Sequence, residues 1–86
     1  MKLIKAFAPW CVPCTAMSAI LQGVNHPLVE SMENFNVDND ASRAIKYGIR
    51  SIPAMILVNE HTDEVVKILV GIKNKEQILE FLEHGE

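Results

Sequence analysis

Both cysteines of this 86-residue chain fall within one stretch, Ala8-Pro9-Trp10-Cys11-Val12-Pro13-Cys14, with two residues between them. An apolar, strand-like run precedes this stretch and a helical pattern follows it. The N-terminus of a helix presents unpaired backbone N–H groups and a partial positive charge, which favour a thiolate over a thiol. A cysteine placed there can have its pKa lowered from ~8.5 to ~3.5–7.5. The stretch therefore indicates a reactive dithiol, and thiol–disulfide exchange is the working hypothesis. A structural role is disfavoured, because a bridge across two residues closes almost no loop.

The residues on either side of the dithiol predict a strand and a helix. Residues 3–8 are apolar on both faces except at Lys5, which is typical of a short strand. Residues 17–24 carry apolar side chains at helical spacing, and Pro13 falls where a first-turn proline is tolerated. Gly23, Asn25 and Pro27 predict the end of this helix.

The rest of the chain contains five further predicted elements. These are a weak strand over 32–37, a short helix between an Asp40 N-cap and Gly48, a buried strand over 54–58, a returning strand over 65–70, and a last helix capped by Asn74. The last helix is expected to bury Ile78, Leu79 and Leu82 and to leave Glu76, Glu80 and Glu83 in water. The order βαβαββα predicts an α/β fold with a four-stranded mixed sheet, a right-handed first crossover and helices on both faces.

Composition favours one globular domain over residues 1–86. Hydrophobic residues make up 49% of the chain, which is enough for a core, and the net charge is -3. A mildly acidic chain without a basic cluster argues against nucleic acid as a partner. No apolar run approaches the ~20 residues of a membrane helix, and residues 1–7 do not fit a signal peptide. A reducing, cytoplasmic location is therefore expected.

The order of elements and three motifs resemble the thioredoxin superfamily in a minimal form. Trp10-Cys11-Val12-Pro13-Cys14 is similar to the thioredoxin WCGPC motif, with valine in place of glycine. Tyr47-Gly48-Ile49-Arg50-Ser51-Ile52-Pro53 is similar to the stretch that leads to the cis-proline of that family. Val70-Gly71 falls where the family has a glycine beside its substrate groove. The likeness covers nearly the whole chain, although the first strand and helix of full-length thioredoxins have no counterpart in it.

The resemblance implies a protein-disulfide reductase. Cys11, expected to be the more exposed thiol, would attack a substrate disulfide as a thiolate, and Cys14 would resolve the mixed disulfide. Resolution would be fast because the second thiol is already in place. Pro13 would support the dithiol turn. The redox-active Cys11–Cys14 disulfide would serve in place of a cofactor.

The resemblance also implies a substrate platform at Pro53. A cis peptide bond before this proline would turn the backbone of Ile52 outward, toward an extended substrate segment. Trp10, Ile52, Pro53 and Gly71 would form the apolar rim on which protein substrates rest.

Lys5 departs from the family pattern. It stands where thioredoxins usually bury an aspartate that assists proton transfer from the second cysteine, and the matching lysine of the family falls at about Asn34. In one reading Lys5 is functional, because a nearby ammonium stabilises the Cys14 thiolate and a desolvated lysine can accept a proton. In the other reading Lys5 leans toward solvent and has no chemical role.

The partners implied by the resemblance are disulfide-containing proteins such as ribonucleotide reductase. The electron donor would be a thioredoxin-reductase-like protein or a glutathione-based system, and the chain would act as a monomer. Two alternatives stay open at this point. One is a glutaredoxin-like, glutathione-dependent oxidoreductase. The other is a docking subunit that uses the same fold to bind a larger protein.

A metal site is not expected. Zinc requires four ligands, and the three histidines, His26, His61 and His84, do not lie at ligand spacing from the dithiol. These histidines are interpreted as loop or terminal surface residues.

Overall fold

A four-stranded sheet forms the centre of the computed structural model, which describes residues 1–83. Its strands are β1 (Lys2–Phe7), β2 (Glu33–Asn36), β3 (Ala54–Val58) and β4 (Val65–Val70), in the spatial order β2-β1-β3-β4. β1 pairs with β2 in parallel and with β3 antiparallel, and β3 pairs antiparallel with β4. The predicted mixed sheet is confirmed, and each strand lies within two residues of its expected range.

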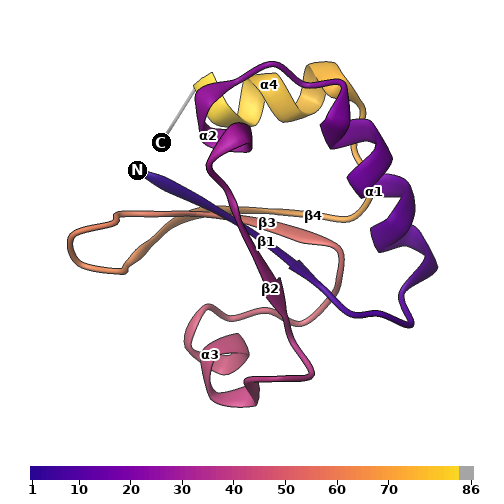
Figure 1. The fold of residues 1–86 in the computed structure, drawn as a ribbon. Helices are drawn as coiled ribbons and strands as arrows, with labels where there is room; N and C mark the ends of the chain where they lie inside the picture. The colour runs from indigo at the N-terminus through magenta and orange to yellow at the C-terminus, as the bar shows by residue number, and fades with distance from the viewer. Residues whose placement is uncertain (84–86) are drawn as a thin grey trace.

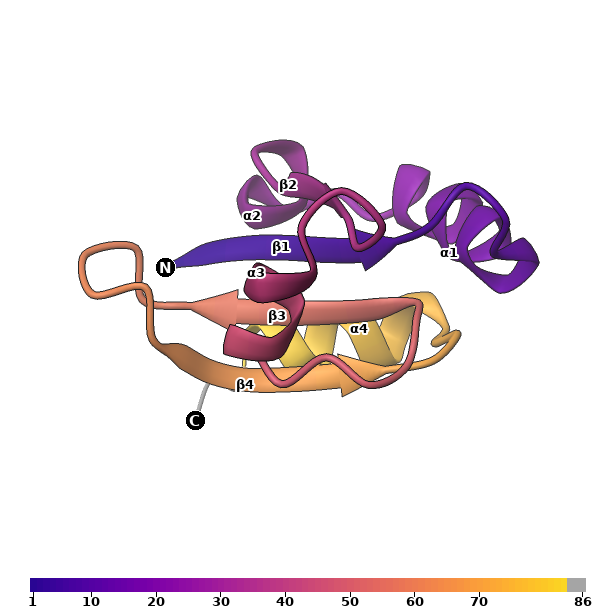
Figure 2. The same cartoon turned by 90° about the horizontal axis from the view of Figure 1, so that it is seen from below.

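Within residues 1–83, four helices cover the two faces of this sheet unequally. They are α1 (Val12–Gln22), α2 (Pro27–Glu30), α3 (Ala41–Lys46) and α4 (Lys75–Glu83). α1, α2 and α4 lie on one face and α3 alone lies on the other (Figure 1). The view from below shows α3 in front of the strands and α4 behind them (Figure 2). α2 was not expected: Pro27 does not simply follow the end of α1, but begins this second short helix after the His26 N-cap.

Several expected helix ends are present. Asp40 caps α3 by accepting a 3.0 Å hydrogen bond from the backbone N–H of Arg43, and Gly48 follows that helix with a φ of 72°. Asn74 and Gln77 exchange two hydrogen bonds at the start of α4, of 3.0 and 2.8 Å. In α4 the expected buried residues Ile78 and Leu82 are joined by Phe81, whereas Leu79 is half-buried. His84, interpreted from sequence as a surface residue, lies outside the described residues.

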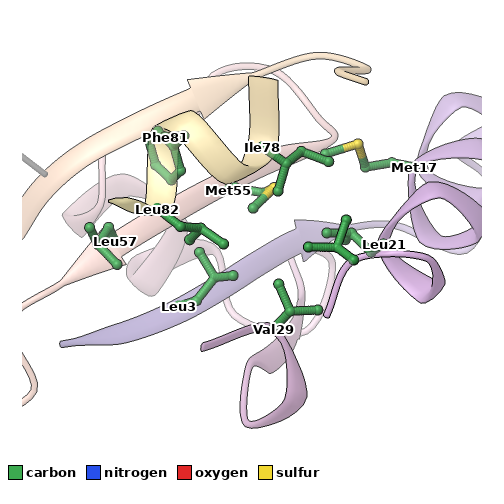
Figure 3. Close-up of a cluster of buried hydrophobic side chains, with 10 residues drawn as sticks. Leu3, Met17, Leu21, Val29, Met55, Leu57, Ile78, Phe81 and Leu82 are labelled. Carbon is green, nitrogen blue, oxygen red and sulfur yellow. The ribbon is translucent and has the colours of Figure 1, made fainter. Parts of the chain in front are cut away.

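The sheet separates two hydrophobic clusters. Figure 3 shows the larger one, between the strands and the three-helix face, with α4 and α1 side chains directed at the strands. Its buried members are Leu3, Met17, Leu21, Val24, Val29, Met55, Leu57, Ile78, Phe81 and Leu82. The cluster beneath α3 contains Ile4, Ala6, Phe35, Tyr47, Ala54, Ile56 and Val58. All five residues of β3 are buried, as expected for a strand covered on both faces.

Strand register brings three distant segments to one end of the sheet. Ala6 pairs with Ala54, and Ala54 pairs with Val70. The end of β1, the start of β3 and the end of β4 therefore lie side by side. The dithiol stretch follows β1, Pro53 directly precedes β3, and Gly71 directly follows β4.

Candidate active site

The dithiol forms the first turn of α1. Cys11 is the N-cap residue in an extended conformation, and Pro13 occupies the first turn as expected. The two cysteines are joined by a disulfide, with their Cα atoms 5.2 Å apart. The backbone N–H of Cys14 donates a 3.2 Å hydrogen bond to Cys11 Sγ. In the reduced protein this donor and the helix dipole would favour a thiolate at Cys11.

The burial of the two cysteines differs from the expectation. Cys11 and Cys14 are each 4% exposed, so Cys11 is not the more accessible sulfur in this disulfide-bonded form. Both belong to a small buried cluster with Ala8, against which Phe7 and Ile52 pack. The distinction between the two sulfurs lies in backbone geometry instead, because Cys11 Sγ is the one that accepts the helix N–H.

The predicted cis-proline is present beside the dithiol. The peptide bond between Ile52 and Pro53 is cis. The backbone N–H of Gly71, at a φ of 91°, donates a 2.8 Å hydrogen bond to the carbonyl oxygen of Pro53. This bond ties the loop after β4 to the loop before β3.

The assignment of Pro53 to the apolar rim requires a correction. Its side chain is among the most deeply buried of those described, at under 2% exposure. Ile52 is half-buried and packs against the cysteine cluster. Pro53 therefore presents no side-chain surface, and any contact of this segment with another chain falls to Ile52 and to the backbone.

Trp10 stands at the surface next to the dithiol, 68% exposed. Its indole Nε1 donates a 2.9 Å hydrogen bond to Asp38 Oδ2, which holds the ring in one orientation. A groove of about 330 Å³ lies between this ring and α3, and Ile45 and Ile52 line part of it. Neither Asp38 nor Ile45 was identified from sequence.

Lys5 is buried, with 6% exposure, so the interpretation that it leans toward solvent is wrong. Its Nζ donates a hydrogen bond to the Ser18 hydroxyl of α1 and lies 5.6 Å from the centre of the Phe7 ring. Asn34 pairs with Lys5 in the β1–β2 register, so the two positions that depart from the family pattern are neighbours. Burial lowers the pKa of Lys5, because the charged ammonium loses hydration there. Ser18 was not identified from sequence.

The chain matches the family model for thioredoxin over residues 1–84. It is 32% identical over 78 residues to the thioredoxin of Bacillus subtilis, covering 88% of this chain and 73% of that protein. It is 34% identical over 84 residues to the thioredoxin of Buchnera aphidicola subsp. Baizongia pistaciae, covering 93% of this chain and 73% of that protein. The chain belongs to the thioredoxin family. Together with the Cys11–Cys14 disulfide, this membership makes the protein a thiol–disulfide oxidoreductase.

Solved thioredoxin structures share the fold. The thioredoxin of Malassezia sympodialis superposes with a TM-score of 0.77 at 20% identity, covering 95% of this chain and 72% of that one. A mutant thioredoxin from Halobacterium salinarum gives a TM-score of 0.77 at 24% identity, covering 95% of this chain and 71% of that one. Within residues 1–83, no helix combines the length and apolar composition needed to cross a bilayer.

Proposed function

We propose that this thioredoxin-family protein reduces disulfides of protein substrates, with Cys11 as the nucleophile. The observation that carries this assignment is the hydrogen bond from the Cys14 backbone N–H to Cys11 Sγ at the start of α1. A donor aimed at that sulfur, together with the positive end of the helix dipole, stabilises the thiolate form that attacks disulfides.

The reaction proceeds through two exchanges. The Cys11 thiolate attacks one sulfur of the substrate disulfide, which forms a mixed disulfide and releases the other substrate sulfur as a thiolate. Cys14, after losing its proton, attacks Cys11 Sγ. This second exchange forms the Cys11–Cys14 bond, breaks the mixed disulfide and releases the second substrate thiolate. Two electrons pass from the dithiol to the substrate, and the released thiolates take up protons.

The substrate platform lies beside the two cysteines. An extended substrate segment would pair with the backbone of Ile52, while Trp10 and the loop at Gly71 flank it. Exposed apolar surface at this site supports a protein substrate, since such surface is unfavourable unless a partner covers it. Pro53 contributes by shaping the Ile52 backbone rather than by side-chain contact, because its ring is buried.

The cellular setting follows from the same chemistry. Each turnover oxidises the dithiol to a disulfide, so the protein needs a donor of two electrons and two protons. A reductase of the thioredoxin-reductase type or a glutathione-based system is therefore its partner. Substrates of the ribonucleotide reductase kind form disulfides during turnover and belong to this class. A monomer in the cytoplasm, where thiols are kept reduced, suits this role.

Trapping of the mixed disulfide tests the assignment of the two sulfurs. Cys14→Ser, incubated with oxidised insulin, is expected to accumulate a covalent complex that dithiothreitol releases, whereas Cys11→Ser is expected to form none. Both variants should lose insulin reduction by about a thousandfold or more, since the activated thiolate or its resolving partner is missing. If Cys11→Ser traps substrate and Cys14→Ser does not, the roles are reversed.

A further inference from the structure

Lys5 is the one charged side chain that is buried among residues 1–83. A buried ammonium is costly unless other groups solvate it, and its hydrogen bond to Ser18 Oγ supplies one such partner. The two exchange steps above do not use this lysine. Burial of the Lys5 ammonium costs folding free energy, and the two exchange steps do not explain why a lysine stands there.

Helical spacing places the partner of Lys5 on the same side of α1 as the resolving cysteine. Ser18 follows Cys14 by four residues, and residues four apart lie one above the other on a helix. A cleft of about 480 Å³ is lined by Lys5, Ser18 and Cys14 together, with Thr15 and Asn34 at its walls. A cleft of this size that has polar side chains in its walls has room for water, which can link the hydroxyl to the sulfur.

Few other groups can exchange a proton with Lys5. On β2 its register partner is the uncharged Asn34, and on β3 the facing residue is the apolar Met55. A second cleft, of about 460 Å³, is lined by Lys5, Ser18 and Glu30, and Glu30 is itself exposed. Two acids thus share a cleft with Lys5 and Ser18: Glu30 in this second cleft and the thiol of Cys14 in the first, and only Cys14 takes part in the exchange steps.

We propose that Lys5 and Ser18 form a proton relay that receives the Cys14 proton when the mixed disulfide is resolved. The proposal rests on the proposed function, in which Cys14 attacks Cys11. The Cys14 S–H bond breaks and its proton passes through the cleft and the Ser18 hydroxyl to the neutral Lys5 amine, which becomes an ammonium. The freed thiolate forms the bond to Cys11 Sγ, and the substrate thiolate leaves.

Electrostatics favour this direction of transfer. Burial lowers the pKa of Lys5, which raises the share of the neutral amine able to accept a proton. Transfer then converts two neutral groups into a thiolate and an ammonium on the same cleft, where their attraction offsets part of the cost of forming charge. Ser18 both passes the proton and positions Lys5, because its hydroxyl is hydrogen-bonded to Lys5 Nζ on the helix that bears Cys14.

The resolving step can be isolated by attaching thionitrobenzoate to Cys11 of the reduced protein. Attack by Cys14 releases thionitrobenzoate, and the rate is followed by absorbance as a function of pH. Lys5→Met is expected to move the midpoint of this profile upward by about one pH unit and to slow release about tenfold at neutral pH. Ser18→Ala is expected to slow it about threefold, because the amine stays but its link to the helix is lost. Ser18→Thr, which keeps the hydroxyl, should restore the profile.

Matched controls separate a relay from general effects. Lys75→Met and Ser31→Ala change a lysine and a serine far from the cleft, and neither should move the profile. Lys5→Arg keeps a positive charge but cannot release or accept a proton near neutral pH. Lys5→Arg should therefore not restore the parent profile, although its charge can still attract the thiolate.

Three results would overturn the relay. They are an unmoved profile in Ser18→Ala, a wild-type profile in Lys5→Arg, and a shift in Glu30→Gln as large as that in Lys5→Met. A parent protein that releases no thionitrobenzoate at any pH would instead contradict the proposed role of Cys14 itself. The two proposals therefore fail in distinguishable ways, and Ser18→Ala tests the relay even if a substitution at Lys5 prevents folding.

Discussion

The two ends of the sheet are built from different kinds of contact. At the end that carries the 59–64 turn, charges are paired; the ion pairs there are Met1–Glu60, Lys2–Glu33, Arg43–Glu33 and Lys46–Asp63. At the dithiol end, large apolar side chains are left in solvent, and Trp10, Val12, Val70 and Ile72 are between 48% and 78% exposed. The same four strands thus connect an end that carries these ion pairs, besides the exposed side chains of Met1 and Val65, to an end where exposed apolar side chains surround the dithiol.

This difference indicates how the protein divides stability from function. Charges that are paired and hydrated need no further partner. The ion pairs at the end that carries the 59–64 turn can therefore stabilise the fold without forming a binding surface for other molecules. Apolar surface around the dithiol lowers the free energy of binding when another chain covers it, but contributes nothing to folding while it is exposed. Substitutions at one end should therefore change stability, and substitutions at the other should change activity.

In the comparison of the two ends, the largest effect is expected at Arg43. Its guanidinium makes two hydrogen bonds to Glu33, of 2.5 and 2.7 Å, and its centre lies 4.8 Å from the Phe35 ring and 5.4 Å from the Tyr47 ring. Arg43→Met should lower the free energy of unfolding by ~2 kcal/mol, since a bidentate pair and cation–π contacts are lost together. Urea unfolding measures this loss.

Arg50 provides the matched control at the other end, where it borders the groove beside Trp10. Arg50→Met should change stability by less than ~0.5 kcal/mol, because the side chain is exposed. Equal losses in Arg43→Met and Arg50→Met would remove the distinction between the two ends.

Trp10 is expected to show the opposite behaviour. Trp10→Ala should lower kcat/KM for insulin about tenfold, or ~1.4 kcal/mol of transition-state binding, because an exposed aromatic anchor is lost. The rate with a small aromatic disulfide should stay close to that of the parent protein, and so should the unfolding midpoint. Trp10→Phe separates the apolar ring from the indole N–H that binds Asp38. A similar loss with both substrates would mean that Trp10 acts on the dithiol rather than on the protein partner.

The smallest effect is a pH dependence at Glu33. The hydrogen bond from Arg43, followed by that from Lys2, lowers the pKa of Glu33 to about 2 in the folded protein. A lowered folded pKa gives stability that is present above the unfolded value of ~4.3 and is lost as the pH falls through about 2. Because water reaches these side chains and screens the pair, the loss should be ~1 kcal/mol.

Glu33→Gln supplies the comparison for this titration. The variant should be less stable than the parent protein near neutral pH, and the difference should shrink as the pH is lowered from ~4.3 toward 2. Urea unfolding at several pH values tests this. A constant difference between the two proteins across that range would exclude Glu33 as the titrating group.

Much of the fold could be predicted because its signals are local. The alternation of apolar runs with turn residues located all four strands and three of the four helices. Asp40, Gly48 and Asn74 marked helix ends through short-range capping chemistry that a few neighbouring residues determine. The four-residue α2 was missed for two reasons. Pro27 was interpreted as a signal for the end of α1, although it begins the new helix. A helix of four residues is also too short to show a hydrophobic periodicity.

The site was predicted less completely, since its contacts join residues far apart in sequence. Trp10 was identified from its position before Cys11, but its partner Asp38 lies 28 residues later and looked like any turn aspartate. Pro53 was placed correctly in the loop and incorrectly at its surface, because a motif gives position along the chain and not depth. The sequence allowed two interpretations of Lys5, and only its packing against α1 shows that it is buried.

The order of residues alone determined the reactive pair, the helix that begins at it and the α/β arrangement of the chain. Spacing of two residues between thiols, capping residues and hydrophobic periodicity are properties of short segments, so they can be recognised without coordinates. Only the tertiary structure decided that the cysteines are equally buried, that the Pro53 ring is covered, and that Lys5 lies against Ser18 on a cleft shared with Cys14. These facts depend on how β1, α1 and the loop before β3 pack together, and burial sets the hydration, and hence the proton affinity, of each group.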